Sequence, residues 1–314
     1  MKTNLILVVS VLFASLLWLG YTPSMSPPSL ITKYANDESA FVRDQQGLRV
    51  HFRDQGVRGT KAIVMLHGNS NSLHNFEPLV ARLKDQYRLV TLDFPGHGLT
   101  GAHPNNQYGY AGLSDALELV MMELELDNIV LLGHSMGGWV AWRYTVDNPD
   151  LVDSLILMSA TGMPVRPGDP KPDVGLGFKL LQSSIGPILS AYTMPRISIE
   201  KSMDKSTYKK LHTRDQIIDR SWELLRHSEN RAALATRAHQ GRELDKADLA
   251  KKISQPTLLI WGEQDTFVPP SAALSFSERI NNSTTVMLPE VGHLPMLEAT
   301  AAVAQAIRDF IPVK

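Results

Sequence analysis

The sequence predicts an α/β domain in which helices cover both faces of a mostly parallel β-sheet. From residue 41 onward, apolar runs of strand length alternate with segments of helical periodicity. The chain has 314 residues, of which 43% are hydrophobic, enough for one large core that carries an insertion. A serine also stands between glycines, in Gly133-His134-Ser135-Met136-Gly137, directly after one of the apolar runs.

The first 22 residues are expected to be a membrane anchor or a signal segment. Residues 4–21 carry no charge, and as a helix they would be about 27 Å long, enough for a bilayer core. An uncleaved anchor is favoured over a cleaved signal peptide because no A-x-A-like site follows. Lys2 favours a cytoplasmic N-terminus. The predicted localisation is therefore a membrane-anchored protein with an exported catalytic domain, or a secreted or periplasmic protein if the segment is cleaved.

Residues 23–40 are predicted to be a stiff linker, because they contain Pro23, Pro27 and Pro28. The core of the predicted domain comprises residues 41–160 and 253–314. Seven strands are expected from the apolar runs, at residues 48–52, 62–66, 89–93, 129–132, 154–158, 257–261 and 284–288. Between the third and fourth of them, apolar residues at helical spacing predict a helix that packs on the sheet.

Residues 161–252 are predicted to form a helical cap, or lid, between the fifth and sixth strands. Roughly ninety residues separate these strands, where a few would join a strand to a helix. Thr213 and Gln216 predict a capping box at the start of one cap helix. Because such an insertion leaves from the carboxyl end of a strand, where ligands bind, it is expected to exclude water and shape the substrate pocket. A cap that only buries its own apolar faces is the alternative.

The strand, turn and helix around Ser135 predict a nucleophile. A serine on a strained turn has its hydroxyl exposed, and Gly133 and Gly137 let the strand and the helix approach closely. Met136 opens the helix, so its backbone N–H and the helix dipole face the negative charge that develops on a bound substrate. The N–H of Met136 is therefore one expected donor of an oxyanion hole.

A serine hydroxyl needs a base within hydrogen-bond reach and a third group that orients the base. His293 follows the last predicted strand, and Asp265 follows the preceding one, so both lie in loops that converge on Ser135. The carboxylate of Asp265 is expected to hold the histidine. Glu263 and Glu290 are alternatives, but each lies closer to a strand and is interpreted as a surface carboxylate.

The turn after the second predicted strand is expected to supply the second oxyanion donor, the backbone N–H of Asn69. His67 is expected to hold this turn, and residues 93–98 to shape the floor of the pocket. Catalysis by His97 is an alternative. His134 is expected to point away from the serine hydroxyl.

With these motifs, the chain resembles the α/β-hydrolase superfamily over roughly residues 45–311. The resemblance is carried by Asp-Phe-Pro-Gly-His-Gly at 93–98, Gly-His-Ser-Met-Gly-Gly at 133–138, Trp-Gly-Glu-Gln-Asp at 261–265 and Gly-His-Leu-Pro-Met-Leu-Glu at 292–298. The chain is most similar to capped serine esterases and lipases, which implies acyl-enzyme chemistry on carboxylic esters. Hydrolases that cleave carbon-carbon bonds in ring-fission products use the same three residue types and also fit, as do perhydrolase and haloperoxidase variants. Dehalogenases and epoxide hydrolases use an aspartate nucleophile, which Ser135 contradicts.

The leading prediction is a serine esterase or lipase with the triad Ser135, His293 and Asp265, acting on a small-molecule ester with a hydrophobic acyl group. The alternatives are a carbon-carbon bond hydrolase and, in a different class, a non-catalytic binding protein of the same fold. A net charge of −1 without a long basic run gives no reason to expect nucleic acid. No cofactor or metal is expected, since no phosphate-binding glycine loop or histidine cluster is present. The lack of cysteine excludes disulfides and thiol catalysis.

Overall fold

The computed structural model describes residues 20–164, 166–169, 179–240 and 244–312, and it contains an eight-stranded sheet at its centre. The strand order is β1-β2-β4-β3-β5-β6-β7-β8. β2 is antiparallel to both of its neighbours, and all other pairs are parallel. The mostly parallel α/β fold is therefore confirmed. The strands are β1 (Ser39–Arg43), β2 (Arg49–Gly56), β3 (Ala62–Leu66), β4 (Arg88–Leu92), β5 (Ile129–His134), β6 (Val152–Met158), β7 (Thr257–Gly262) and β8 (Ser283–Leu288).

The seven predicted strands correspond to β2 through β8. β1 has no counterpart in the prediction. It lies at the edge of the sheet, and Val42 is its one buried residue. A strand that buries so little carries almost no hydrophobic pattern, which explains why the sequence does not indicate it.

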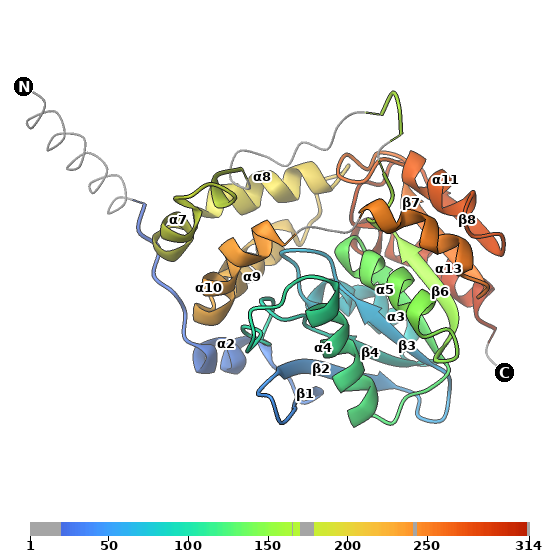
Figure 1. Cartoon of the computed structure of the whole chain (residues 1–314), viewed down its shortest axis with the longest axis horizontal. Helices are drawn as coiled ribbons and strands as arrows, with labels where there is room; N and C mark the ends of the chain where they lie inside the picture. The colour runs from blue at the N-terminus through green and yellow to red at the C-terminus, as the bar shows by residue number, and fades with distance from the viewer. Residues whose placement is uncertain (1–19, 165, 170–178, 241–243, 313–314) are drawn as a thin grey trace, which may run out of the picture.

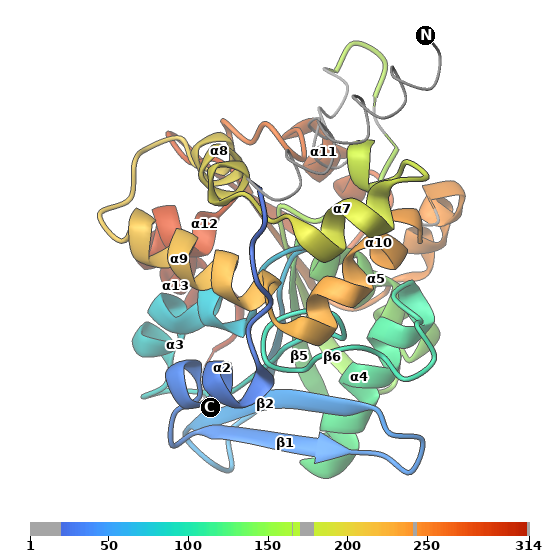
Figure 2. The same cartoon turned by 90° about the vertical axis from the view of Figure 1, so that its left-hand side faces the viewer.

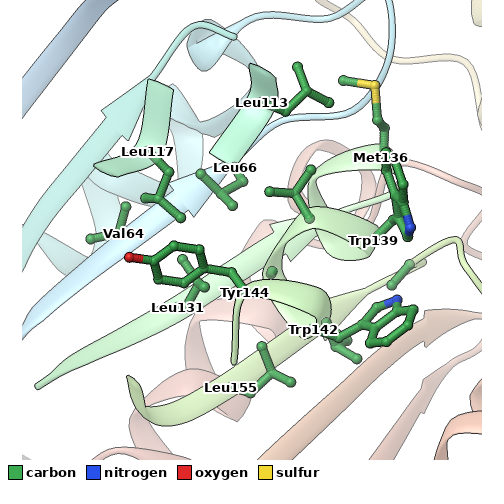
Figure 3. Packing of buried hydrophobic residues seen from close by; sticks show 14 of the residues in the cluster. Val64, Leu66, Leu113, Leu117, Leu131, Met136, Trp139, Trp142, Tyr144 and Leu155 are labelled. Atoms are coloured by element: carbon green, nitrogen blue, oxygen red, sulfur yellow. The ribbon is translucent and has the colours of Figure 1, made fainter. Parts of the chain in front are cut away.

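Helices cover both faces of the sheet (Figure 1). Alternate strand residues serve the two layers: Val64 and Leu131 belong to one core cluster, and Ile63 and Val130 to the other. Figure 3 shows aromatic side chains of α5 packed beside strand residues in the first cluster. The first layer contains α4 (Tyr110–Glu123), α5 (Met136–Asp147), the 3-10 helix η2 (Leu244–Lys252) and α11 (Ser271–Ser277), and the second contains η1 (Leu73–Phe76), α3 (Glu77–Leu83), α12 (Pro295–Glu298) and α13 (Thr300–Phe310).

In its described residues, the segment between β6 and β7, which is predicted to form the cap, contains the α-helices α7 to α10 followed by η2 (Figure 1). Met203, Ile217 and Ile218 of this segment pack into the second core cluster. The capping box is not formed: Thr213 precedes α9, but its φ of −90° and ψ of 9° lie outside the extended region, and its side chain makes no capping bond. The helices are α7 (Gly186–Tyr192), α8 (Arg196–Ser206), α9 (Arg214–Leu225) and α10 (Ser228–His239).

Residues 20–34, here called the N-terminal strap, run along these cap helices (Figure 2). The backbone N–H groups of Thr22 and Met25 donate to carbonyls at the end of α7 and just after α9, at 2.9 and 2.7 Å. α2 (Pro27–Tyr34) follows Ser26, with prolines in its first turn, where a missing N–H costs nothing. Two of the three prolines that predict a stiff linker, Pro27 and Pro28, thus begin a helix.

The predicted localisation, a membrane-anchored or exported catalytic domain, needs correction. Among the helices of the described residues, none combines the length and apolar character needed to cross a membrane. The longest α-helix of that part of the chain, α4, has 14 residues, whereas a bilayer core needs about 20. The segment expected to be the anchor, residues 1–22, lies outside the described residues except for its last three.

Candidate active site

Ser135 stands at a strained turn between β5 and α5. Its φ of 52° and ψ of −115° are unusual for a residue with a side chain. The turn is fixed on both sides, because the N–H of Ser135 donates to Met158 O at 3.1 Å and its carbonyl accepts from the N–H of Thr161 at 3.0 Å. The hydroxyl is thereby held at the carboxyl end of the central strand.

The glycines around Ser135 are required by close backbone contacts. A Cβ on Gly133 would lie 2.3 Å from the carbonyl oxygen of Gly137, and a Cβ on Gly137 would lie 2.2 Å from the carbonyl oxygen of Leu66. A Cβ on Gly138 would lie 2.4 Å from the Cβ of a loop alanine. Larger residues would push α5 away from the sheet and move the serine.

The structure brings Ser135, His293 and Asp265 together from the loops after β5, β8 and β7. The Ser135 hydroxyl lies 3.1 Å from Nε2 of His293, and Nδ1 of His293 lies 2.8 Å from Oδ2 of Asp265. The three residues are 8%, 7% and 5% exposed. A carboxylate at Nδ1 assigns the histidine proton to that nitrogen, so Nε2 is free to accept the serine proton.

The environment of Asp265 keeps its carboxyl group ionised. Burial on its own would raise the pKa of Asp265, but the charge and hydrogen bond of His293 and the N–H groups of Val268 and Phe267 outweigh burial and lower it. Both N–H groups donate to Oδ1 at 2.9 Å. Of the alternative carboxylates, Glu263 is exposed and Glu290 pairs with a surface lysine.

Glu298 is a residue of the site to which the sequence analysis assigns no role. Its carboxylate accepts the backbone N–H groups of Gly292 at 3.1 Å and Leu294 at 3.2 Å, on either side of His293. It also accepts the N–H of Tyr208, just after α8, at 2.6 Å. The loop that carries the histidine is thus tied to the cap. A carboxylate five residues after a candidate base, in the first turn of a helix, is the signal that could have indicated this role.

His134 makes its hydrogen bond with the histidine loop. Its Nε2 lies 2.8 Å from the backbone carbonyl of His293, to which it donates, and the two rings are 4.9 Å apart between centroids. Burial lowers the pKa of His134 to about 3, so its ring is neutral. It therefore supports His293 from the side and makes no bond with the Ser135 hydroxyl.

The turn that carries Asn69 lies against Ser135. A Cβ on Gly68 would be 3.0 Å from the Cβ of Ser135. His67 holds this turn, since its Nδ1 donates to Gly68 O at 2.7 Å and its Nε2 accepts the N–H of Phe94 at 3.0 Å. Burial lowers the pKa of His67, which keeps the ring neutral.

The two predicted oxyanion donors are available for a ligand. Within the described part of the chain, the backbone N–H groups of Asn69 and Met136 donate to no other group. For Met136 the reason is its place at the start of α5, where the N–H has no acceptor within the helix. Met136 follows Ser135 in the chain, and the turn that carries Asn69 packs against Ser135.

The segment 93–98 fixes the loops around the turn and contributes no base. The buried carboxylate of Asp93 accepts from Nδ1 of His51 at 2.7 Å and from backbone N–H groups in the loops after β3 and β4. His97 is bonded to Pro95 O and to Arg237 of the cap, not to Ser135. Burial and the charge of Arg237 hold the pKa of His97 well below its ordinary value. Among the described residues, no group of histidines and carboxylates could hold a metal ion.

The sequence and the fold match known hydrolases. The model of the alpha/beta hydrolase family matches residues 63–306. A 2-hydroxy-6-oxononadienedioate/2-hydroxy-6-oxononatrienedioate hydrolase of Cupriavidus pinatubonensis is 30% identical over 289 residues, which cover 87% of this chain and 95% of that protein. An uncharacterized hydrolase of Bacillus subtilis is 27% identical over 84% of this chain and 95% of its own.

Among solved structures, a serine hydrolase involved in carbazole degradation superposes with a TM-score of 0.72 at 22% identity, covering 88% of this chain and 99% of that one. At this identity the likeness concerns the fold. The family model matches most of the chain, and one relative is 30% identical over 87% of it. The chain therefore belongs to the alpha/beta hydrolase family.

Proposed function

We propose that this protein is a serine hydrolase that forms an acyl-enzyme on Ser135. The observation that carries the proposal is the continuous series of hydrogen bonds from Asp265 through His293 to the Ser135 hydroxyl, at 2.8 and 3.1 Å. This series is able to move the serine proton to Nε2 while Oγ attacks a carbonyl carbon. The ionised Asp265 then stabilises the imidazolium that forms.

The negative charge of the tetrahedral intermediate needs donors on the opposite side of the carbonyl. We assign this role to the backbone N–H groups of Asn69 and Met136. Loss of one such donor typically costs about 3 to 4 kcal/mol of transition-state stabilisation. His293 next gives its proton to the leaving group, and water, activated by the same histidine, releases the acid and restores Ser135.

Hydrolysis of a carbon-carbon bond beside a ketone is the reaction that the relatives favour. The curated relative from Cupriavidus pinatubonensis, at 30% identity, is named for a 2-hydroxy-6-oxo dienoic diacid. In such a reaction, the Oγ–C bond forms as the carbonyl–carbon bond breaks, and the carbon leaving group takes up the proton that His293 carries. Water then supplies the hydroxyl of the released acid and the proton of the serine. The triad geometry accommodates this sequence without any further group.

Ester hydrolysis is the second candidate, and the surface of the cap favours it. Among the described residues of the predicted cap, six large apolar side chains are 40% to 52% exposed, at Leu180, Ile185, Ile188, Tyr192, Ile197 and Tyr208. An apolar cap suits a substrate with a hydrophobic acyl group. In either reaction, the segment 161–252 would form a separate cap domain that acts as a lid over the site. This role is supported by the contacts that the end of α8 makes with the loop of His293.

The deciding experiment combines active-site labelling with a substrate panel. Wild type, Ser135→Ala and Ser159→Ala would be treated with a fluorophosphonate, then assayed with p-nitrophenyl esters of increasing length and with a 2-hydroxy-6-oxo dienoic acid. Ser159 is a matched control: it is buried, has a positive φ of 45°, and lies at the end of the next strand. We expect labelling of wild type and Ser159→Ala, and none of Ser135→Ala.

The substrate panel then separates the candidates. Cleavage of the dienoic acid without ester turnover would support carbon-carbon hydrolysis, and ester turnover alone would support an esterase. A wild type that neither takes up the label nor turns over any substrate would overturn the proposal in favour of a non-catalytic binding protein.

A further inference from the structure

A cationic side chain of the cap reaches the turn that carries Asn69. Arg237 lies in the last turn of α10, and its Nη1 donates to Gly96 O at 2.6 Å. Its Nη2 donates to Oδ1 of Asn69 at 2.6 Å and to Nε2 of His97 at 2.5 Å. One guanidinium thus joins a cap helix to the loop after β3 and to the loop after β4.

The groups around this guanidinium accept its hydrogen bonds and leave room for its side chain. His97 donates from Nδ1 to Pro95 O at 3.0 Å, so its Nε2 carries no hydrogen and accepts from Arg237. A Cβ on Gly96, whose φ is +75°, would lie 2.7 Å from Cδ of Arg237. Only glycine both adopts this backbone conformation readily and leaves room for the arginine side chain.

The charge of Arg237 is balanced by no acid. Among the described residues, no carboxylate forms an ion pair with it, and its three acceptors are neutral. Burial lowers the pKa of Arg237 to about 10, so it stays charged at neutral pH. Arg237 is half-buried, and an arginine that served stability alone would gain more from a carboxylate partner than from neutral acceptors.

Building on the serine-hydrolase proposal above, we propose that Arg237 is a positioning residue for the oxyanion hole. It acts through Asn69: by holding the Asn69 side chain, it fixes the peptide whose N–H faces the developing negative charge. Because Arg237 belongs to the cap, the oxyanion hole would be complete only while α10 is seated on the sheet domain. The positive charge next to the turn also favours the oxyanion electrostatically.

A double-mutant cycle tests this role. The variants are Arg237→Met, Asn69→Ala and the pair, in the full-length protein, and the readout is the rate constant for fluorophosphonate labelling of Ser135. That reaction places negative charge in the oxyanion hole whatever the natural substrate is. Asn69→Ala keeps the backbone N–H and removes only the side-chain bond. Displacing the N–H of Asn69 should cost less transition-state stabilisation than removing it. We therefore expect the labelling rate of each single variant to be about tenfold lower or more.

The expected result is strong non-additivity: in the Asn69→Ala background, Arg237→Met should change the rate by less than about threefold. For a chromogenic substrate that wild type turns over, kcat should fall while KM stays within about twofold. Arg237→Lys keeps the charge but is not able to reach three acceptors, so it should restore little of the rate. Arg226→Met is the control, since that cap arginine bonds to Pro23 O and stacks on Trp222, and it should label at the wild-type rate.

Three outcomes would overturn the inference while leaving the proposed function intact: wild-type labelling of Arg237→Met, a rate loss that is the same in both Asn69 backgrounds, or a loss confined to KM. If Arg237→Met fails to fold, the exposed position of Asn69 still permits a decision. In that case Asn69→Ala alone must be labelled more slowly than wild type, and labelling at the wild-type rate would refute the role of Arg237. A wild type that is not labelled at all would instead contradict the proposed function.

Discussion

Asp265 controls both the orientation and the charge of the proposed base. Its two carboxylate oxygens have different hydrogen-bond partners. Oδ2 accepts from Nδ1 of His293, and Oδ1 accepts the N–H groups of Phe267 and Val268. These contacts fix the carboxylate plane. The histidine therefore has one tautomer and one orientation available, with Nε2 toward Ser135.

At this residue we predict that Asp265→Asn lowers kcat by about four orders of magnitude while the protein stays folded. The amide has nearly the same shape, but it does not stabilise the imidazolium, and its NH₂ group favours the wrong histidine tautomer. Steady-state kinetics with circular dichroism would measure this. Glu263→Gln, an exposed carboxylate two residues earlier, should keep wild-type kcat. A loss of less than tenfold in Asp265→Asn would contradict the assigned role.

The unit of β5, turn and α5 sets the position of Ser135. β5 pairs with β3 and β6 at the middle of the sheet, and α5 is buried along nearly its whole length. The close contact of Gly137 with the carbonyl of Leu66 joins the start of α5 to the end of β3. The same contact brings the turn that carries Asn69 beside Ser135, so one position in α5 affects both Ser135 and this turn.

For this element we predict that Gly137→Ala destabilises the protein by more than about 2 kcal/mol, because the new methyl group would meet backbone atoms that have no room to move. Urea unfolding would measure the free-energy change. Gly109→Ala is the matched control: it precedes α4, its φ is −79°, and a Cβ there meets nothing within 4 Å. That variant should change stability by less than about 1 kcal/mol. Equal stabilities of the two variants would contradict the close-packing explanation.

Across the whole molecule, the segment predicted to form the cap is attached to the loops that carry the proposed base and the proposed oxyanion donor Asn69. At the end of α8, Ser206 accepts the backbone N–H of His293, and Tyr208 just after it donates to Glu298. Arg237 of α10 binds the turn of Asn69. The N-terminal strap runs along the helices of this segment (Figure 2), and Lys33 of the strap pairs with Glu223 of α9. Movement of the cap would therefore disturb both the proposed base and the proposed oxyanion hole.

Buried neutral histidines give the whole molecule a pH-dependent stability. Burial lowers the pKa of His67, His74, His97 and His134, to about 4 for His74 and about 3 for His134. In the unfolded chain these side chains take up protons near pH 6.5. The unfolded state thus binds more protons at acidic pH, and the free energy of unfolding must fall as pH falls below about 6.5.

We predict a slope of about 1.4 kcal/mol per pH unit for each such histidine between its unfolded and folded pKa values. Urea unfolding at several pH values from 7.5 to 4.5 would measure it. His74→Gln, which removes one titrating group, should flatten the slope below pH 6. Stability that is constant from pH 7 to pH 5 would refute this explanation.

The sequence by itself determined the strands β2 through β8, the strained serine turn and the choice of three residues that the fold then brings together. These features depend on local hydrophobic period, on glycine at close contacts and on the order of loops along a parallel sheet, all of which a linear sequence displays. The tertiary structure alone decided the attachment of the cap: Glu298 to Tyr208, Arg237 to Asn69, and the strap to α7 and α9. Such contacts join side chains and backbone groups up to about 200 residues apart, and no local pattern predicts them, because their partners are chosen by packing in three dimensions.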